Sequence, residues 1–328
     1  MSNPLVKPLI IDTDGGVDDA LAIIMALNCP QIDLKAITVL AGNIDVDQAA
    51  NNVLRVIDIV QPDRPPLVAK GCEKPLVRPP FHAAGIHGAD GLGELDQFKT
   101  TDGRPRYPQL TVEPSTEDAI EVLLKAAQEY GSDLTIVALG PLTNIAAALQ
   151  RNRATFQNVG RIVIMGGAVK VPGNISAAAE FNFFVDPDAA QVVMESGIPL
   201  TLVGLDVAMK APLLRKDIED YAQKYPSRVS QFIVDCTGIY MAFYRDHEGF
   251  HGCYLHDPLA IGVAIDSSLV STESVYMVVE TEGRFTAGMS LADLRDRRDE
   301  TSFPPNIDVC LNVDVDRFLD LFYTLMKT

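Results

Sequence analysis

The sequence predicts an α/β fold: an open, mostly parallel sheet flanked by helices on both faces. Two observations support this class. Short apolar runs alternate with segments of helical periodicity along most of the 328 residues, as strands and crossover helices do. Several apolar runs also end in Asp, Asn or Gly, which would place polar side chains on loops at the carboxyl ends of the strands. Open α/β proteins bind their ligands at that edge.

The expected elements follow one another in regular order. Strands are expected at Leu9–Ile11, Leu34–Val39, Pro66–Ala69, Leu134–Leu139, Arg161–Met165, Leu200–Val203, Val275–Val279 and Ile307–Val313. Helices are expected at Val17–Asn28, Val46–Val60, Glu117–Tyr130, Leu142–Gln150, Pro187–Ser196 and Val315–Lys327. The third of these helices is expected to open at Ser115, with Asp118 in a capping-box arrangement. No repeat or change of composition divides the chain, so residues 1–328 are expected to form a single domain.

Three stretches break the alternation and are expected to be irregular. Residues 71–112 are rich in Gly, Pro and His and are too long for an ordinary connection. Residues 166–186 combine glycines with Pro-Gly-Asn and Glu-Phe-Asn, and residues 225–257 mix tyrosines, histidines and acids. If the alternation is correct, all three lie above the carboxyl edge of the sheet as active-site loops.

The composition limits the partners and the compartment. A net charge of −17 argues against nucleic acid or an anionic membrane as a partner. Five scattered cysteines without CxxC spacing are typical of reduced thiols rather than of a disulfide framework or a zinc site. No apolar run approaches the ~20 residues of a membrane span, and no signal-peptide core is present. We therefore expect a cytoplasmic protein.

The most informative feature is a cluster of four carboxylates, which directly follows the apolar run at Leu9–Ile11. It comprises Asp12, Asp14, Asp18 and Asp19. Four acids in one strand–loop–helix unit repel one another unless a cation neutralises them, and a hard divalent ion with oxygen ligands is the simplest solution. The alternative is structural: the last two acids would favour the helix dipole, and the first two would shape the turn.

Further motifs follow the acidic cluster in a characteristic order. They are Ala-Gly-Asn at 41–43, Gly-Ile-His-Gly at 85–88, Ala-Leu-Gly-Pro-Leu-Thr-Asn at 138–144, Met-Gly-Gly at 165–167, Gly-Asn at 173–174, Glu-Phe-Asn at 180–182, Asp-Pro at 186–187 and His-Asp-Pro at 256–258. Together they resemble the inosine–uridine-preferring nucleoside hydrolases over nearly the whole chain. The clearest departure is Gly15, where that family commonly has Pro; this change is expected to loosen the loop without removing a ligand.

The resemblance implies Ca²⁺-dependent hydrolysis of the N-glycosidic bond of ribonucleosides such as inosine or uridine. It assigns Ca²⁺ to the side chains of Asp14, Asp19 and Asp257 and to the backbone carbonyl of Leu139. An all-oxygen set with several carboxylates also suits Ca²⁺ better than zinc. Asp14 is expected to be the general base that activates a water held by the metal, and Asp12 is expected to support the site from behind.

The resemblance also implies the substrate contacts. Ribose contacts are expected from Asp18, Asn43, Asn174, Glu180 and Asn182, and Met165 would either support the sugar or belong to the core. His256 would face the leaving base as an acid or a hydrogen-bond donor, and His87 would reach the sugar or the base. The other histidines are expected on the surface. The chain has no tryptophan, which disfavours the purine-specific branch; the rings available to contact a base instead are Tyr240, Tyr244, Phe181 and Phe250.

Other interpretations remain open at this point. The Asp12-Thr13-Asp14-Gly15 run also fits a phosphatase with an Asp-x-Asp-Gly nucleophile, although a second acidic pair for Mg²⁺ is missing downstream. A non-catalytic nucleoside-binding protein would keep the pocket without the chemistry. The base can be a pyrimidine, hypoxanthine or a modified base, and the resemblance implies a homodimer or homotetramer.

Overall fold

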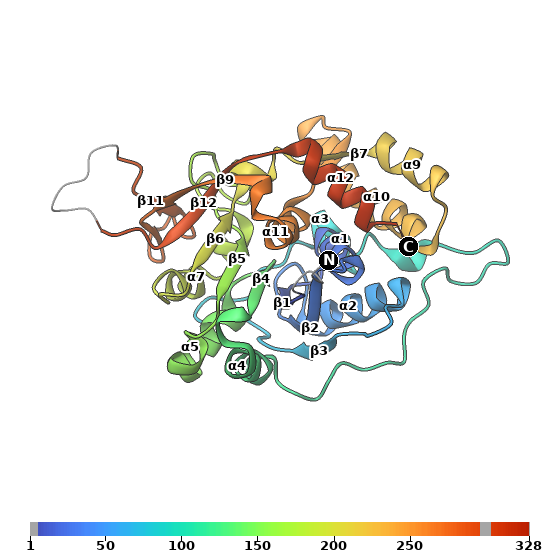
Figure 1. Cartoon of the computed structure of the whole chain (residues 1–328). Coiled ribbons are helices and arrows are strands. Elements are labelled where there is room, and N and C mark those ends of the chain that lie inside the picture. The colour runs from blue at the N-terminus through green and yellow to red at the C-terminus, as the bar shows by residue number, and fades with distance from the viewer. Residues whose placement is uncertain (1–5, 296–302, 328) are drawn as a thin grey trace, which may run out of the picture.

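The computed structural model describes residues 6–295 and 303–327, and its centre is an eight-stranded sheet in the order β3-β2-β1-β4-β5-β6-β12-β9 (Figure 1). Neighbouring strands are parallel except β9, which runs antiparallel to β12. The mostly parallel sheet is thus confirmed. Its strands are β1 (Lys7–Thr13), β2 (Ile32–Val39), β3 (Leu67–Lys70), β4 (Thr135–Ala138), β5 (Arg161–Met165), β6 (Leu200–Val203), β9 (Val270–Val275) and β12 (Ile307–Val313).

Helices cover both faces of this sheet. One face carries α4, α5 and α7, and the other carries α1, α2, α11 and α12. The helices of the described chain are α1 (Val17–Asn28), α2 (Val46–Val60), α3 (Ala84–His87), α4 (Ala119–Tyr130), α5 (Thr143–Phe156), α6 (Phe181–Val185), α7 (Pro187–Met194), α8 (Leu205–Ala208), α9 (Arg215–Lys224), α10 (Arg228–Glu248), α11 (His256–Ile265) and α12 (Val315–Leu325). None of these is both long and apolar enough to cross a membrane.

Strand β1 shows why a strand of this sheet is apolar on successive residues. Leu9 and Ile11 belong to the core on the α1 side of the sheet, and Ile10 belongs to the core on the α4 side. Side chains alternate between the two faces of a strand, and both faces are covered here. A continuous apolar run is therefore required.

Two small antiparallel sheets accompany the main one. They pair β7 (Pro212–Leu214) with β8 (Gly252–Tyr254), and β10 (Met277–Val279) with β11 (Ser290–Ala292). The single strand expected at Val275–Val279 is therefore wrong. Val275 ends β9 in the main sheet, and the chain turns before Met277 into a separate ribbon.

The irregular stretch expected at 225–257 is largely helical, and this is the main correction to the sequence prediction. Its centre is the 21-residue helix α10. Ser227 caps the amino end and exchanges hydrogen bonds with Ser230, and Gly249 with a φ of 67° ends the helix. Its buried residues recur at spacings of three and four, among them Val229, Phe232, Cys236 and Tyr240, so the helical period is present in the sequence.

The start of α4 differs from the expected one in a smaller way. Asp118 is the N-cap, and its carboxylate accepts hydrogen bonds from the backbone N–H groups of Ile120 and Glu121. Ser115 instead pairs with the edge strand β3, donating its N–H to the carbonyl of Val68 at 2.7 Å. The cap falls on the stronger candidate because a carboxylate accepts from two successive amides.

The strand order creates a crevice at the centre of the sheet. From β1 the chain builds outward through β2 and β3, then returns to place β4 on the opposite side of β1. Connections leave β1 and β4 in opposite directions, and ligands of open α/β sheets bind at such a switch point. The two strands stay joined at their carboxyl ends, where Leu139 donates its N–H to the Asp12 carbonyl at 2.7 Å.

Candidate active site

A cavity of about 290 Å³ lies at this switch point. It brings together most of the side chains singled out in the sequence: Asp18, Asn43, His87, Leu139, Met165, Asn174, Glu180, Asn182, His256 and Asp257. Asp14 and Asp19 lie directly behind this lining. The Nδ2 atom of Asn43 joins them, at 3.0 Å from Asp14 Oδ1 and 3.4 Å from Asp19 Oδ2.

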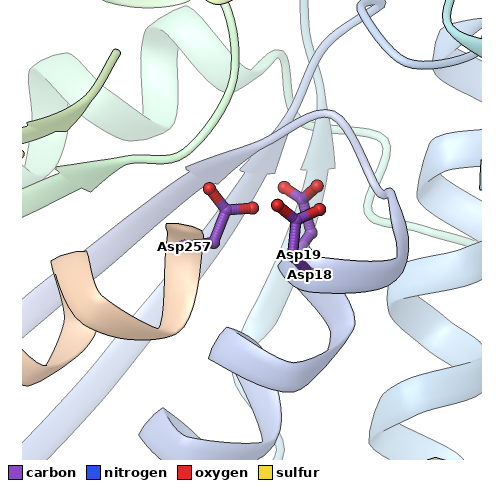
Figure 2. A group of neighbouring side chains, drawn as sticks. All are labelled: Asp18, Asp19 and Asp257. Carbon is purple, nitrogen blue, oxygen red and sulfur yellow. The ribbon is translucent and has the colours of Figure 1, made fainter. Parts of the chain in front are cut away.

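Three carboxylates form the floor of the cavity (Figure 2). Asp18 and Asp19 lie in the first turn of α1, and Asp257 lies in the first turn of α11. One oxygen from each lies within 4.8 Å of the other two, and all three residues are buried. Among the described residues, no lysine or arginine forms an ion pair with any of them.

Burial and mutual repulsion shift the acidity of this cluster. Burial, followed by the charge of Asp19, raises the pKa of Asp18 to about 8. The pKa values of Asp14 and Asp257 are raised well above their usual range, again mainly by burial and then by neighbouring carboxylates. Charged groups in such a place need protons or a cation as partners.

The loop between β1 and α1 places its own carboxylates. Thr13 donates its hydroxyl to Asp19 Oδ1, and the N–H of Gly16 donates to Asp19 Oδ2 at 2.8 Å. These bonds close the first turn of α1 and hold the carboxylate of Asp19 back toward the end of β1. The position of Asp19 therefore follows from local sequence.

Gly15 is fixed rather than loose. Its φ is 71°, and a Cβ atom there would lie 2.8 Å from the Cα of Ala49. Its N–H donates to Thr13 Oγ1 at 3.3 Å, and its carbonyl accepts a bond from Asn52 at 2.9 Å. Proline would have neither this φ nor the N–H, so the departure from the family pattern changes the backbone path of the loop.

Asp12 supports the site from behind, in the position expected for it. Its Oδ1 accepts bonds from the Thr38 hydroxyl at 2.5 Å and from Asn144 Nδ2 at 2.8 Å. Its buried Oδ2 has no hydrogen-bond partner within the described chain. Burial raises the pKa of Asp12 to about 7.

The Gly42-Asn43 motif serves to hold Asp14. Asp14 Oδ2 accepts the backbone N–H of Asn43 at 2.7 Å, and a Cβ atom on Gly42 would lie only 2.1 Å from that oxygen. The carboxylate of Asp14 is thus turned toward Asn43, while Asp18 takes the place beside Asp19 and Asp257. The metal set expected from the sequence (Asp14, Asp19, Asp257 and the Leu139 carbonyl) stays a prediction, and Asp14 shares the Asn43 amide with Asp19 at the edge of this cluster.

The chemistry of the floor fits a hard divalent cation. Every candidate ligand is an oxygen, no lysine or arginine of the described residues pairs with the cluster, and Leu139 lines the same cavity. Carboxylate and carbonyl oxygens are the ligands that such ions prefer. The floor of this cavity can therefore hold a metal ion.

One wall of the cavity is polar and closely bonded. Glu180 accepts backbone N–H bonds from Gly167 at 2.9 Å and from Asn182 at 3.0 Å, and burial raises its pKa to about 7. Asn182 Nδ2 donates to the carbonyls of Leu139 at 2.7 Å and Met165 at 3.1 Å. These bonds fix polar side chains that can bind vicinal hydroxyls.

Asn174 belongs to the same wall. Its Oδ1 accepts the N–H of Phe181 at 3.0 Å. Its Nδ2 group has no such backbone acceptor among the described residues and is available to a ligand. The loop that carries it is held by Asp206, which accepts the N–H groups of Val169 at 2.8 Å and Lys170 at 2.6 Å.

His87 closes another side of the cavity as a neutral ring. Its Nδ1 accepts the N–H of Val17 at 3.1 Å, so the remaining hydrogen lies on Nε2. Burial lowers its pKa to about 4. The imidazole stacks on the ring of Tyr240, with 5.0 Å between the ring centroids.

A row of polar atoms runs from the floor to His256. The Tyr240 hydroxyl lies 3.4 Å from Asp18 Oδ2 and 3.4 Å from the Tyr244 hydroxyl. The Tyr244 hydroxyl in turn lies 3.1 Å from His256 Nε2. Burial, followed by the neighbouring His87, lowers the pKa of His256 to about 4. Its Nδ1 is buried and lacks a hydrogen-bond partner in the described chain.

Sequence reasoning only partly identified the ring-lined mouth. Tyr240, Phe243 and Tyr244 of α10 line it together with Phe181, whereas Phe250 stacks on Tyr254 with 4.9 Å between centroids and does not line it. The three rings of α10 recur at spacings of three and four residues, which was the available signal. The surface positions expected for the remaining histidines are confirmed: His82, His247 and His251 are exposed.

Comparisons with known proteins agree over nearly the whole chain. Residues 9–320 match the family model described as inosine-uridine preferring nucleoside hydrolase. The chain belongs to this family. A pyrimidine-specific ribonucleoside hydrolase, RihA of Klebsiella pneumoniae (strain 342), is 39% identical over 319 residues, which make up 97% of each chain.

Solved structures of related enzymes share the fold of this nucleoside hydrolase. The plant enzyme PpNRh1 is 31% identical with a TM-score of 0.88 and covers 98% of this chain and 99% of its own. A purine-preferring ribonucleoside hydrolase from Gardnerella vaginalis is 35% identical with a TM-score of 0.87 over 98% of both chains. The protein is thus a hydrolase of the N-glycosidic bond of ribonucleosides, and the Asp-x-Asp-Gly phosphatase interpretation is set aside.

We predict that Ca²⁺ raises the melting temperature of the metal-free hydrolase more at about pH 7.5 than at about pH 5. Asp18 has a raised folded-state pKa of about 8, so the stability it contributes is present below its unfolded pKa and is lost as pH rises through 8. A cation that replaces the protons restores it. Differential scanning fluorimetry after chelator treatment measures both gains.

The matched control for this experiment is a pair of Asp→Asn variants. Asp257→Asn removes one carboxylate of the floor and should abolish the gain. Asp63→Asn changes an exposed aspartate and should keep it. Equal melting temperatures with and without Ca²⁺ at both pH values would contradict the metal site.

Proposed function

We propose that this hydrolase cleaves uridine and inosine to ribose and free base with bound Ca²⁺, and that Asp14 is its general base. The observation that carries the proposal is the buried carboxylate floor, which adjoins a cavity walled by amide and carboxylate groups. No lysine or arginine of the described residues pairs with this floor. Asp14, Asp19, Asp257 and the Leu139 carbonyl would hold the cation, which would lower the pKa of the attacking water and orient the sugar diol. The remaining steps are performed by side chains of the chain itself.

Asp14 suits the role of base because of how it is held. Both of its oxygens accept bonds from Asn43, at 2.7 Å from the backbone and 3.0 Å from the side chain. These bonds orient the carboxylate beside the floor. Its pKa is raised mainly by burial, which strengthens it as a proton acceptor. Asp14 then takes the proton of the water as the glycosidic bond breaks.

The polar wall is proposed to hold the ribose. Positive charge builds on the sugar in the oxocarbenium-like transition state of glycoside hydrolysis, and the buried carboxylates of Asp18 and Glu180 stabilise that charge. Asn43, Asn174 and Asn182 bind hydroxyls through amide donors and acceptors. Met165, with its sulfur 3.5 Å from Asn182 Nδ2, supports the sugar from below.

His256 is proposed to assist the leaving base as a neutral donor. Its low pKa of about 4, caused mainly by burial, argues against an imidazolium at neutral pH. The neutral ring instead accepts a hydrogen bond from the Tyr244 hydroxyl, which is 3.1 Å from Nε2, and donates its own hydrogen bond to the base. A base that gains a hydrogen bond as it departs carries less negative charge, which lowers the barrier.

The donors at the mouth favour bases with oxo groups. His87 presents an Nε2–H, and His256 carries its hydrogen on Nδ1 when its Nε2 accepts from the Tyr244 hydroxyl. The oxo groups of uracil and hypoxanthine accept such bonds, whereas adenine has an amino group in place of the hypoxanthine oxygen. Relatives named for pyrimidine specificity and for purine preference both match this chain, which supports activity on both kinds of oxo base.

The first test separates base from ligand. Asp14→Asn keeps an oxygen near the floor but cannot accept the proton of water, so kcat should fall at least ~10²-fold. Binding of ribose should weaken less, because the other contacts remain. Steady-state kinetics with uridine measures both, and Asp63→Asn serves as the control. Near-normal turnover by Asp14→Asn would place the base elsewhere.

The second test concerns His256. His256→Ala should slow uridine and inosine hydrolysis by roughly 10²–10³-fold, the usual cost of removing one hydrogen-bond donor from a developing negative charge. It should largely spare p-nitrophenyl riboside, whose leaving group departs unaided. His251→Ala, on the exposed loop before β8, is the matched control. Equal losses on both kinds of substrate would mean that His256 acts only by positioning Asp257.

The third test is a substrate panel of uridine, inosine, cytidine and adenosine. The kcat/KM values for uridine and inosine should exceed that for adenosine by roughly tenfold or more. The donors of the site would face the amino group of adenine and would be left unpaired. Release of free base and of reducing sugar is measured in parallel. Adenosine turnover equal to that of inosine would contradict the proposed base selection, and a protein that binds but cleaves none would be a nucleoside-binding protein.

A further inference from the structure

Asn52 is a buried side chain to which the proposed chemistry gives no role. It lies on α2 and is 1% exposed. Its Nδ2 donates to the carbonyl of Gly15 at 2.9 Å and to the carbonyl of Asp90 at 2.8 Å. The first carbonyl belongs to the acidic loop, residues 14–16, and the second to the histidine loop, residues 88–93.

The amide of Asn52 is fully engaged in this bridge. An NH₂ group carries two hydrogens, and each one reaches a different loop. The Oδ1 atom accepts a bond from Gln48 Nε2 at 2.9 Å, which fixes the orientation of the amide. Both donors are therefore committed to active-site backbone, and the acceptor is committed to the helix.

Glycines let both loops approach α2 closely. A Cβ atom on Gly15 would lie 2.8 Å from the Cα of Ala49, and one on Gly91 would lie 3.0 Å from Asn52 Nδ2. Both glycines also have a positive φ, 71° and 73°. The backbone of each loop thus packs directly against α2, and the Asn52 amide sets the distance between the two loops.

The two loops meet again at the cavity. His87, which directly precedes the histidine loop, accepts the N–H of Val17, which directly follows the acidic loop, at 3.1 Å. The same imidazole lies 3.9 Å from Asp18 Oδ1. The distance between the loops therefore decides where His87 lies relative to the carboxylates of the floor.

We propose that Asn52 is a positioning residue that couples the acidic loop to the histidine loop, and thereby fixes His87 against Asp18 for substrate binding. The inference rests on the proposed function only in that His87 and Asp18 contact the nucleoside. Asn52 acts through the backbone of Gly15 and Asp90 and does not touch the substrate itself.

The test compares Asn52→Asp with Asn51→Asp in the Ca²⁺-saturated enzyme. Asp has the shape of Asn but faces the two carbonyls with oxygen instead of N–H. Asn51 is the exposed neighbour on the same helix, so the control adds the same charge. Loss of a buried hydrogen bond should make the amides of residues 14–18 and 86–93 exchange roughly tenfold faster in Asn52→Asp. Hydrogen–deuterium exchange by mass spectrometry measures this without any substrate.

Activity gives a second measurement. In Asn52→Asp, kcat/KM for uridine should fall by roughly 10²-fold, as expected when a substrate-binding group is displaced by about 1 Å, and Asn51→Asp should match the unmodified enzyme. Asn52→Ala with Asn51→Ala provides the same comparison if the Asp variant does not fold. Exchange in both loops that equals the control, or faster exchange in one loop alone, would overturn the coupling. An unmodified enzyme that cleaves no nucleoside would instead refute the proposed function.

Discussion

Burial of like charges at the carboxyl end of β1 is the constraint on which the rest of the structure depends. Asp12, Asp14, Asp18 and Asp19 are all buried within one strand–loop–helix unit, and Asp257 joins them from α11. Each carboxylate needs donors to remain in place. Backbone amides, Thr hydroxyls and Asn side chains meet that need for Asp14, Asp19 and Asp12 Oδ1, and Gly42 leaves room for Asp14, whereas Asp12 Oδ2 has no partner in the described chain.

The wall and the mouth of the cavity differ in how firmly hydrogen bonds hold their side chains. The wall that carries Glu180 and Asn182 is rigid, because its side chains are bonded to backbone groups on several strands and loops. The mouth is made of rings on α10 and of two neutral imidazoles, with few fixed bonds. In the proposed function, the wall binds the sugar that all substrates share and the mouth binds the base in which they differ.

The sheet and its parallel order could be predicted from the sequence because they depend on local patterns. The apolar run at Leu9–Ile11 and the acids behind it identify β1 and the first carboxylates of the floor, whereas Asp257 and the polar wall were named only through the family resemblance. Helix α10 was missed, although its buried residues recur at spacings of three and four, because tyrosines, histidines and acids in the same stretch were interpreted as a loop. The role of Asn52 was missed because its two partners lie 37 and 38 residues away. The turn of Asp14 toward Asn43 likewise depends on tertiary packing.

The floor of the cavity is assembled from segments that are far apart in the sequence. Asp18 and Asp19 lie near the amino end, and Asp257 follows more than two hundred residues later. During synthesis, the first strand and helix leave the ribosome long before the segment that completes the cluster. Until that segment emerges, the carboxylates of Asp18 and Asp19 lack the third member of the cluster. The late arrival of α11 makes the last third of translation the step at which the site first becomes whole.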